Sequence, residues 1–106
     1  MVSIDDVKAL GLRIGEIVEV QPHPNADRLY VLKVKIGEEE RTLVAGIKSS
    51  YKEEELIGKK IVVITNLRPA TIRGVESQGM LLAADGGDVI SLLTVDRDVP
   101  SGSEVR

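Results

Sequence analysis

The chain has 106 residues, 42% of them hydrophobic and 29% charged, which is typical of one folded domain and excludes a disordered chain. It contains no cysteine, so disulfides, thiolate metal sites and cysteine nucleophiles are all excluded. The formal net charge of −3 excludes binding to nucleic acid through an overall positive field, so any such site must be a local cluster of Arg and Lys.

The N-terminal segment predicts a short helix and then a long strand. Ser3–Asp6 has a capping-box-like spacing, and Gly11 ends the helical pattern that follows it. From Leu12 to Gln21 apolar and polar residues alternate, as in a strand with one buried face. Gly15 lies within this alternation, where a bend or bulge would let the strand curl.

A hairpin is expected next. Residues 22–27 are a cluster of turn residues that cannot lie inside a strand or a helix. Residues 29–36 alternate again and predict a second strand, and residues 41–45 predict a third. The segment 37–40 turns the chain between them, so the two strands form a hairpin.

The following segment predicts a short helix and a buried strand. Residues 50–56 are rich in helix formers and are followed by Gly58, a residue type that commonly ends helices. Residues 60–67 contain a continuous apolar run, which predicts a strand buried on both faces. Residues 68–79 are polar and broken by Pro and Gly, so we expect a loop there.

Two last strands are expected at 80–84 and 89–95, with a hairpin turn at 85–88. After the N-terminal helix, the order is then three strands, a short helix and three strands, beginning with a long bent strand. This order predicts an all-β fold, the five-stranded Greek-key barrel called the OB-fold. An SH3-like barrel is the main alternative, but the helical connection and the long first strand favour the OB-fold. Residues 1–106 form a single domain in this interpretation.

The sequence offers no constellation of catalytic residues. The lone His23 lies between two prolines and has no cysteine partner, so local hydrogen bonding is its better interpretation. The adjacent carboxylates of Glu53–Glu55 would point in different directions on a helical turn, which favours a solvated face over a metal site. We therefore expect a non-enzymatic domain with no cofactor and no bound metal.

Signals for membranes or export are also lacking. No apolar run approaches the ~20 residues that cross a bilayer. Met1–Asp6 has neither the basic region nor the apolar stretch of a secretory signal. We expect a cytoplasmic protein with no membrane partner.

Two segments carry side chains suited to RNA. In Asn25–Arg28, Asn and Asp can hydrogen-bond their own backbone and hold the turn rigid, which would make Arg28 a fixed cationic contact. Arg73–Met80 collects an Arg, a Ser hydroxyl, a Gln amide and open backbone NH groups, which are groups that contact phosphates and 2′-hydroxyls. From spacing alone, the first segment is better explained as a simple turn, and periodicity does not decide for the second.

Several blocks of the chain together carry a more specific signal. They are Leu12–Ile17, His23–Tyr30, Val44–Ile47, Leu56–Lys59, Asn66–Pro69 and, the strongest, Arg73–Ala84. In this order they resemble the tRNA-binding domain that occurs at the C-terminus of many methionyl-tRNA synthetases, in free-standing tRNA-binding proteins and in multisynthetase scaffold proteins. The resemblance extends from about Asp5 to Val105.

This resemblance implies an OB barrel with additional C-terminal β elements, commonly assembled as a homodimer. It implies structure-dependent binding of tRNA by its L shape, with little sequence preference. The tRNA-contacting positions of the family match Asn25, Arg28, Ser77 and Met80, although the family often has Lys where this chain has Arg28. The implied partners are tRNA, a second copy of the chain and, where the domain is appended or a separate subunit, the catalytic part of methionyl-tRNA synthetase.

Further candidates come from the residues themselves. Lys33 and Lys35 share one face of the second strand, and Arg41 opens the strand paired with it. Together with Arg28 and Arg73, these cations can form a basic stripe despite the negative net charge. The expected tRNA-binding residues are Asn25, Arg28, Lys33, Lys35, Arg41, Arg73, Ser77, Gln78 and Met80.

The mode of binding follows from the aromatic content. The chain lacks Phe and Trp and contains two Tyr residues, so a platform for stacking unpaired bases is almost absent. We therefore expect recognition of the folded tRNA exterior through backbone and shape. One such face releases few counterions and binds tRNA weakly. Dimerisation or docking on a synthetase would raise the overall affinity for tRNA.

Two other functions stay open. Some relatives of this fold act as homodimeric export chaperones, so a protein-binding module is the main alternative to tRNA binding. The domain could also serve only to dimerise a synthetase. Apolar residues near both ends, Ile4, Val7, Leu10 and 92–99, are explained about equally well by a dimer interface and by covering of the open ends of the barrel.

Overall fold

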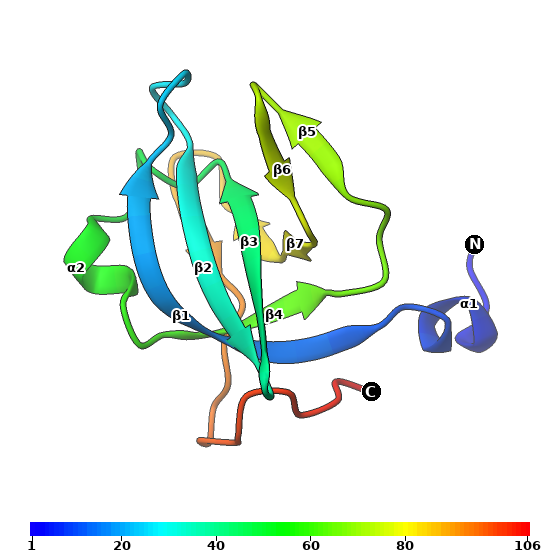
Figure 1. Ribbon diagram of the computed structural model, residues 1–106. Coiled ribbons are helices and arrows are strands. Elements are labelled where there is room, and N and C mark those ends of the chain that lie inside the picture. The colour runs from blue at the N-terminus through cyan, green and yellow to red at the C-terminus, as the bar shows by residue number, and fades with distance from the viewer.

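The computed structural model describes residues 1–106, and it is built mainly of strands (Figure 1). In chain order its elements are α1 (Ile4–Lys8), β1 (Leu12–Pro22), β2 (Tyr30–Ile36), β3 (Glu39–Ala45), α2 (Glu53–Leu56), β4 (Lys60–Ile64), β5 (Ala70–Ile72), β6 (Val75–Ser77), β7 (Met80–Leu81), β8 (Ala83–Asp85) and β9 (Ile90–Leu92). The short helix expected between the third and fourth strands is therefore α2.

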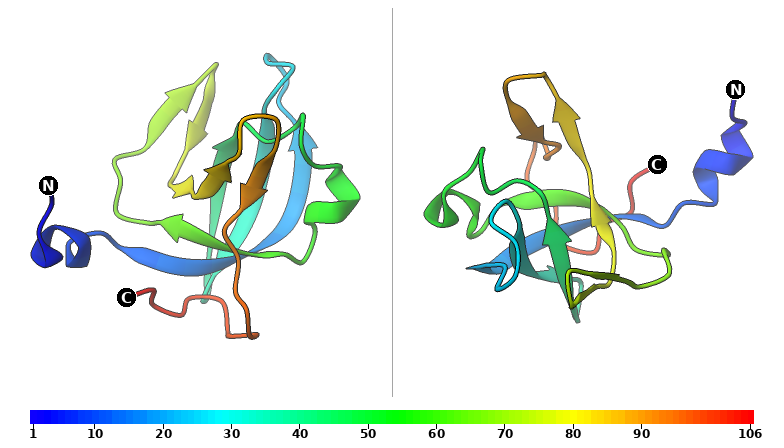
Figure 2. Two further views of the ribbon diagram at one scale, coloured as in Figure 1. Left: turned by 180° about the vertical axis from the view of Figure 1, so that it is seen from behind. Right: turned by 90° about the horizontal axis from the view of Figure 1, so that it is seen from above.

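One antiparallel sheet of five strands, in the order β3-β2-β1-β4-β7, curls around the core (Figures 1 and 2). The curl depends on β1, which changes its partner along its length. From Leu12 to Glu16 it pairs with β4, and from Glu16 to Pro22 it pairs with β2. The predicted all-β barrel with a long, bent first strand is confirmed.

Gly15 allows β1 to fold closely over the core. A Cβ atom at this position would lie 2.5 Å from Cγ1 of Val34, a distance that no real side chain tolerates without a shift of its neighbour. Two residues further on, the pairing of β1 with β2 shifts register between Ile17 and Glu19, as in a β-bulge. The strand thus contains the close packing and the irregularity that its glycine suggested.

The core consists mainly of alternate residues from the curled sheet, together with Ile47 from the loop after β3, Leu56 of α2 and Leu92 of β9. In β2, for example, the buried positions alternate with the exposed Lys33 and Lys35. Leu56 of α2 is fully buried and joins this cluster. The largest fully buried side chains are Ile17, Leu32, Val34, Leu43, Leu56, Ile61 and Val63. Burial of each side chain contributes ~1.5–3 kcal/mol of transfer free energy to the stability of the fold.

Residues 68–79 were expected to form a loop, and this expectation is wrong. They contain the hairpin formed by β5 and β6, which projects from the barrel (Figure 1). Its turn is Arg73–Gly74, with φ of 53° and 92°, the backbone signature of a type I′ turn. Such turns usually have the sequence Asn-Gly or Asp-Gly. Because this turn has arginine at the first position, the sequence did not predict a hairpin here.

The strand expected over 80–84 is divided at Leu82. The N–H of Leu82 donates to Val62 on β4, and its carbonyl accepts from Leu93. The chain therefore leaves the main sheet at this residue, and β8 and β9 pair with each other as a separate hairpin. β9 ends at Leu92 and β4 at Ile64, both three residues earlier than expected.

The C-terminal segment returns to the first half of β1. The N–H of Ile14 donates to Ser103 at 2.9 Å, and Val105 donates to Leu12, also at 2.9 Å. β1 is thus flanked here by β4 on one edge and by the C-terminal segment on the other. α1 extends beyond the barrel near this segment, and none of its residues is buried (Figures 1 and 2). Neither helix is long and apolar enough to cross a membrane.

Candidate nucleic-acid interface

Two loops that are far apart in sequence meet at one end of the barrel. The β1–β2 loop contains Asn25, whose Nδ2 donates to the carbonyl of Arg73 at 3.1 Å. In return, Nη2 of Arg73 donates to the carbonyl of Asn25 at 3.2 Å. This reciprocal pair joins the β1–β2 loop to the tip of the β5–β6 hairpin, so the two candidate RNA-binding segments form one surface.

His23 adds a third connection beneath this pair. The residue is only 5% exposed. Nδ1 accepts the backbone N–H of Asn25 at 2.9 Å, so Nε2 carries the proton and donates to the carbonyl of Ile72, also at 2.9 Å. The interpretation of His23 as a local hydrogen-bonding residue therefore misses its second bond. The sequence feature that could have indicated a structural role was a lone His between two prolines, with Asn25 two residues after it.

The guanidinium groups of Arg28 and Arg73 are the accessible cations of this surface. Both residues are exposed. The four ion pairs of the molecule involve Lys33, Lys60 and Arg41, and none involves Arg28 or Arg73. Because neither charge is neutralised within the chain, both remain free to pair with phosphate.

Ser77 and Gln78 close the barrel against the edge of β3. Oγ of Ser77 accepts the backbone N–H of Val44 at 3.0 Å and donates to the carbonyl of Gly79. Oε1 of Gln78 accepts the N–H of Thr42 at 2.9 Å, and the Gln78 N–H donates back to Thr42. These two side chains therefore replace a regular ladder between β3 and the chain leading into β7.

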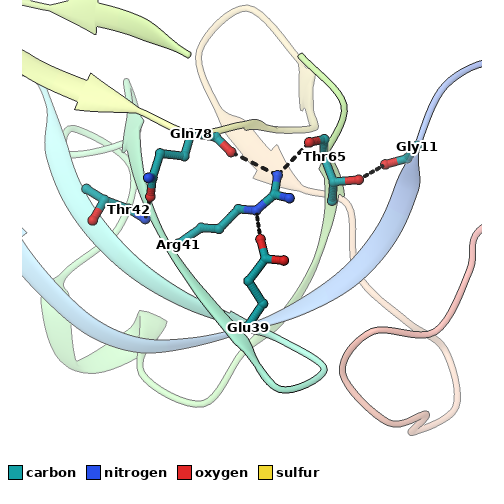
Figure 3. A network of polar contacts seen from close by, with 6 residues as sticks. All are labelled: Gly11, Glu39, Arg41, Thr42, Thr65 and Gln78. Atoms are coloured by element: carbon teal, nitrogen blue, oxygen red, sulfur yellow. Dashed lines mark hydrogen bonds and ion pairs between the residues drawn. The ribbon is translucent and has the colours of Figure 1, made fainter. Parts of the chain in front are cut away.

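The side chain of Arg41 extends from β3 toward Thr65 and Gln78 (Figure 3). Its Nη1 donates to the carbonyls of Thr65 and Gln78, and its Nε donates to the carboxylate of Glu39. The side chain is only 24% exposed. The charge of Arg41 is thus directed into the molecule, toward the segments on either side of the β4–β7 pairing.

Lys33 and Lys35 lie on the outer face of β2 among carboxylates. Nζ of Lys33 is 4.0 Å from Glu19 and 3.8 Å from Glu40. Lys35 is directly opposite Glu16 on β1 and Glu40 on β3. Because acidic and basic side chains alternate across the three strands, this face carries little net positive potential. The five cations expected in one stripe therefore lie in three different settings.

Met80 supplies an apolar surface at the start of β7. It pairs with Ile64 on β4, and it is 53% exposed. It follows directly on the segment Ser77–Gly79 that closes the barrel. The exposed thioether therefore sits on a backbone that is held by several hydrogen bonds.

Both tyrosines take part in the scaffold, with Tyr30 buried and Tyr51 half-buried. Tyr30 is buried, and its hydroxyl donates to the carbonyl of Tyr51 at 2.7 Å. The Tyr51 hydroxyl accepts the N–H of Leu92. Burial, together with the carboxylates of Glu53–Glu55, raises the pKa of the Tyr30 hydroxyl, which keeps it protonated as a donor. Both rings are parts of the scaffold.

The same combination of loops and barrel occurs in known proteins. The family model described as "Putative tRNA binding domain" matches residues 12–104. The chain belongs to this tRNA-binding domain family. It is 57% identical over 105 residues to a methionine–tRNA ligase of Thermococcus kodakarensis. The aligned region covers 99% of this chain and 14% of the ligase. The tRNA-binding domain described here thus spans about a seventh of that relative's length.

Solved structures of similar size match the whole tRNA-binding domain. A protein related to methionyl-tRNA synthetase from Pyrococcus horikoshii has a TM-score of 0.92 at 36% identity, covering 100% of this chain and 98% of that one. The CsaA chaperone protein of Picrophilus torridus has a TM-score of 0.92 at 33% identity, covering 100% of both chains. The barrel and its added C-terminal β elements are therefore shared by proteins that carry different functional names.

Proposed function

We propose that this domain binds tRNA at the end of the barrel where the β1–β2 loop meets the β5–β6 hairpin. The observation that carries the proposal is the reciprocal contact between Asn25 and Arg73, which places two unpaired arginines, Arg28 and Arg73, on loops that are fixed to each other. Cations carried on loops that are fixed to each other bind phosphates at a lower ordering cost than cations on loops that move separately. Membership of the tRNA-binding domain family supports tRNA as the ligand.

Binding is expected to depend on the shape of tRNA more than on its sequence. Tyr30 is buried and the half-buried Tyr51 packs against the core, so the chain offers little aromatic surface on which unpaired bases could stack. Phosphate and 2′-hydroxyl contacts to a folded RNA remain available. Met80 would add an apolar contact beside them.

The candidate residues divide by their contacts. Asn25, Arg28 and Arg73 are exposed on the two joined loops, and Met80 is exposed at the start of β7. Ser77 and Gln78 belong to the same site, where we propose that they chiefly hold its backbone. The proposed contribution of Lys33 and Lys35 is small, because neighbouring carboxylates offset their charge.

We further propose that the domain acts as a homodimer through α1 and the C-terminal segment. A cavity of about 530 Å³ separates these two segments, and its lining includes Ile4, Val7, Leu10 and Val105. Ile4 is 74% exposed, and no residue of α1 is buried within the chain. A second copy would cover this apolar surface and present a second cationic site to the same tRNA.

The proposed setting is cytoplasmic protein synthesis. The domain would act without chemistry of its own, either as part of a methionyl-tRNA synthetase or as a free-standing protein, and would hold tRNA for a catalytic site elsewhere. The identity with methionine–tRNA ligases over almost the whole chain supports the synthetase setting.

A salt-dependent titration tests this function directly. Binding to tRNA, duplex RNA and single-stranded DNA would be compared over a series of salt concentrations. We expect the tightest binding to tRNA, with an affinity that falls steeply as salt rises because phosphate contacts release counterions. Equal binding to all three nucleic acids would contradict recognition of tRNA shape. A failure to bind tRNA at low salt would refute the proposed function.

A protein-binding function is the second candidate, because the CsaA chaperone protein matches the full chain. Its binding site would then be an apolar surface, with little dependence on salt. Unfolded client protein added to the titration distinguishes the two: a client that binds equally well at high salt, and does not compete with tRNA, favours this candidate.

A further inference from the structure

Arg41 lies on the core-facing side of β3, where the row of buried residues on this strand ends. It is opposite the buried Val34 on β2, and the next residues on the same side of β3 are Leu43 and Ala45, which are both buried. An arginine at this position therefore continues a row of core residues. Its guanidinium has to find acceptors inside the molecule or at the edge of the core.

The acceptors that it finds flank the pairing between β4 and β7. Thr65 follows the last residue of β4, and Gln78 precedes Gly79 and Met80 at the start of β7. Nη1 of Arg41 donates to both carbonyls (Figure 3). One guanidinium thus holds together the two chain segments from which the pair Ile64–Met80 extends.

We propose that Arg41 is a positioning residue, which fixes the backbone that presents Met80 to tRNA and does not contact phosphate itself. This inference rests on the proposed function of the site. The carboxylate of Glu39 already pairs with Nε, and two carbonyls occupy Nη1. The Glu39 carboxylate offsets the charge of Arg41, so an external anion gains less from it than from Arg28 or Arg73, which form no ion pair.

Thr65 extends this connection to the segment that follows α1. Its N–H and its Oγ1 both donate to the carbonyl of Gly11, at 2.8 Å and 2.7 Å. The segment bonded to Arg41 is therefore anchored independently at its far side. Of the two residues whose carbonyls accept from Arg41, Gln78 is therefore the one that would move if Arg41 were lost. Its N–H and Oε1 would still be hydrogen-bonded to Thr42.

Lysine cannot reproduce these contacts. The guanidinium donates from Nε and Nη1 in fixed, different directions, whereas an ammonium on a flexible stem is a point charge. Replacement by lysine therefore retains the charge of Arg41 and loses its geometry. This difference separates a positioning role from a direct electrostatic contact with phosphate.

The test compares Arg41→Lys and Arg41→Met in the full chain, with Arg97→Met as the matched control. Arg97 is exposed, and its segment lies at the opposite end of the molecule from the β1–β2 loop (Figures 1 and 2). Circular dichroism would establish the conditions under which each variant is folded. We expect both Arg41 variants to weaken tRNA binding about tenfold with an unchanged salt slope, because no phosphate contact is lost. Arg97→Met should bind as the unaltered chain does.

Two results would overturn the inference. One is normal tRNA affinity in Arg41→Lys, and the other is a salt slope that falls by about one in Arg41→Met. Hydrogen exchange on the tRNA-free protein gives an independent readout, since Arg41→Met should speed exchange in residues 78–82 and leave the β1–β2 pairing protected. Unchanged exchange there rejects the positioning role, whereas failure of the unaltered chain to bind tRNA rejects the proposed function.

Discussion

The Nε2 atom of His23 lies 2.9 Å from the carbonyl oxygen of Ile72, and this bond connects residues 49 positions apart in the chain. It lies next to the contact between Asn25 and Arg73, so the β1–β2 loop is joined to the tip of the β5–β6 hairpin at two adjacent positions, Ile72 and Arg73. Two hairpins that would otherwise move separately are thereby combined into one surface.

Replacement of His23 by Ala should separate these two hairpins. The carbonyl of Ile72 and the N–H of Asn25 would each lose a partner in a nearly buried site, at a cost of ~1–3 kcal/mol. We expect a lower melting temperature and weaker tRNA binding, measured by calorimetry and by filter binding. His23→Gln, which can donate to Ile72, should recover part of both losses. Unaltered tRNA affinity in a folded His23→Ala variant would show that the loops need no such connection.

Arg28 and Arg73 should act as separate phosphate contacts. Each substitution by Ala is expected to weaken tRNA binding and to lower the salt slope by about one, because one ion pair with phosphate is lost. Lys33→Ala is the matched control, since the charge of Lys33 already faces Glu19 and Glu40. If Lys33→Ala lowered affinity as much as the two arginine substitutions, the outer face of β2 would have to be included in the site.

Ser77→Ala should destabilise the barrel. The substitution removes the acceptor of the Val44 N–H in a buried position, at a cost of ~1–3 kcal/mol. For a domain of this size, each 1 kcal/mol lowers the melting temperature by about 4–8 °C. Thermal unfolding measures the effect, with the exposed Ser49→Ala as control. An unchanged melting temperature with a large loss of tRNA affinity would instead assign Ser77 to direct contact.

The ion pair between Lys60 and Asp98 should make stability fall in acid. The Lys60 ammonium, 2.8 Å from Oδ1, holds the pKa of Asp98 below its usual value of 3.8. Because the folded pKa is lower than the unfolded one, the stabilisation is present above pH 3.8 and is lost as the pH falls through the folded value. Asp98→Asn should weaken this acid dependence in urea unfolding, and Asp96→Asn, which forms no ion pair, should not.

Val7→Glu should prevent dimer formation if α1 forms the interface. A carboxylate on the apolar side of α1 would be buried against the second copy without a partner. Sedimentation velocity should then detect a monomer, and binding of tRNA should weaken because only one cationic surface remains. Asp5→Lys on the same helix replaces a negative charge of α1 by a positive one but leaves its apolar side intact, so it should not prevent dimer formation. A variant that still sediments as a dimer would place the interface elsewhere.

The sequence by itself determined the local character of most elements. Alternation in residues 12–21 and 29–36 identified the strands, and the glycine at position 15 marked the curled strand, because side-chain periodicity depends only on neighbouring residues. The resemblance likewise identified Asn25 and Arg28 as candidates. The β5–β6 hairpin was missed because its type I′ turn uses Arg73 in place of the usual Asn or Asp.

Only the tertiary structure decided which polar side chains are free to bind RNA. Arg28 and Arg41 are the same residue type, yet Arg28 is exposed without an ion pair and Arg41 is bound to two carbonyls and a carboxylate. The partners of Arg41, Ser77 and His23 include residues 24 to 49 positions away. Such partners depend on how the barrel closes. Every residue has a backbone carbonyl, so a hydrogen bond to a distant carbonyl does not produce a recognisable pattern in the sequence.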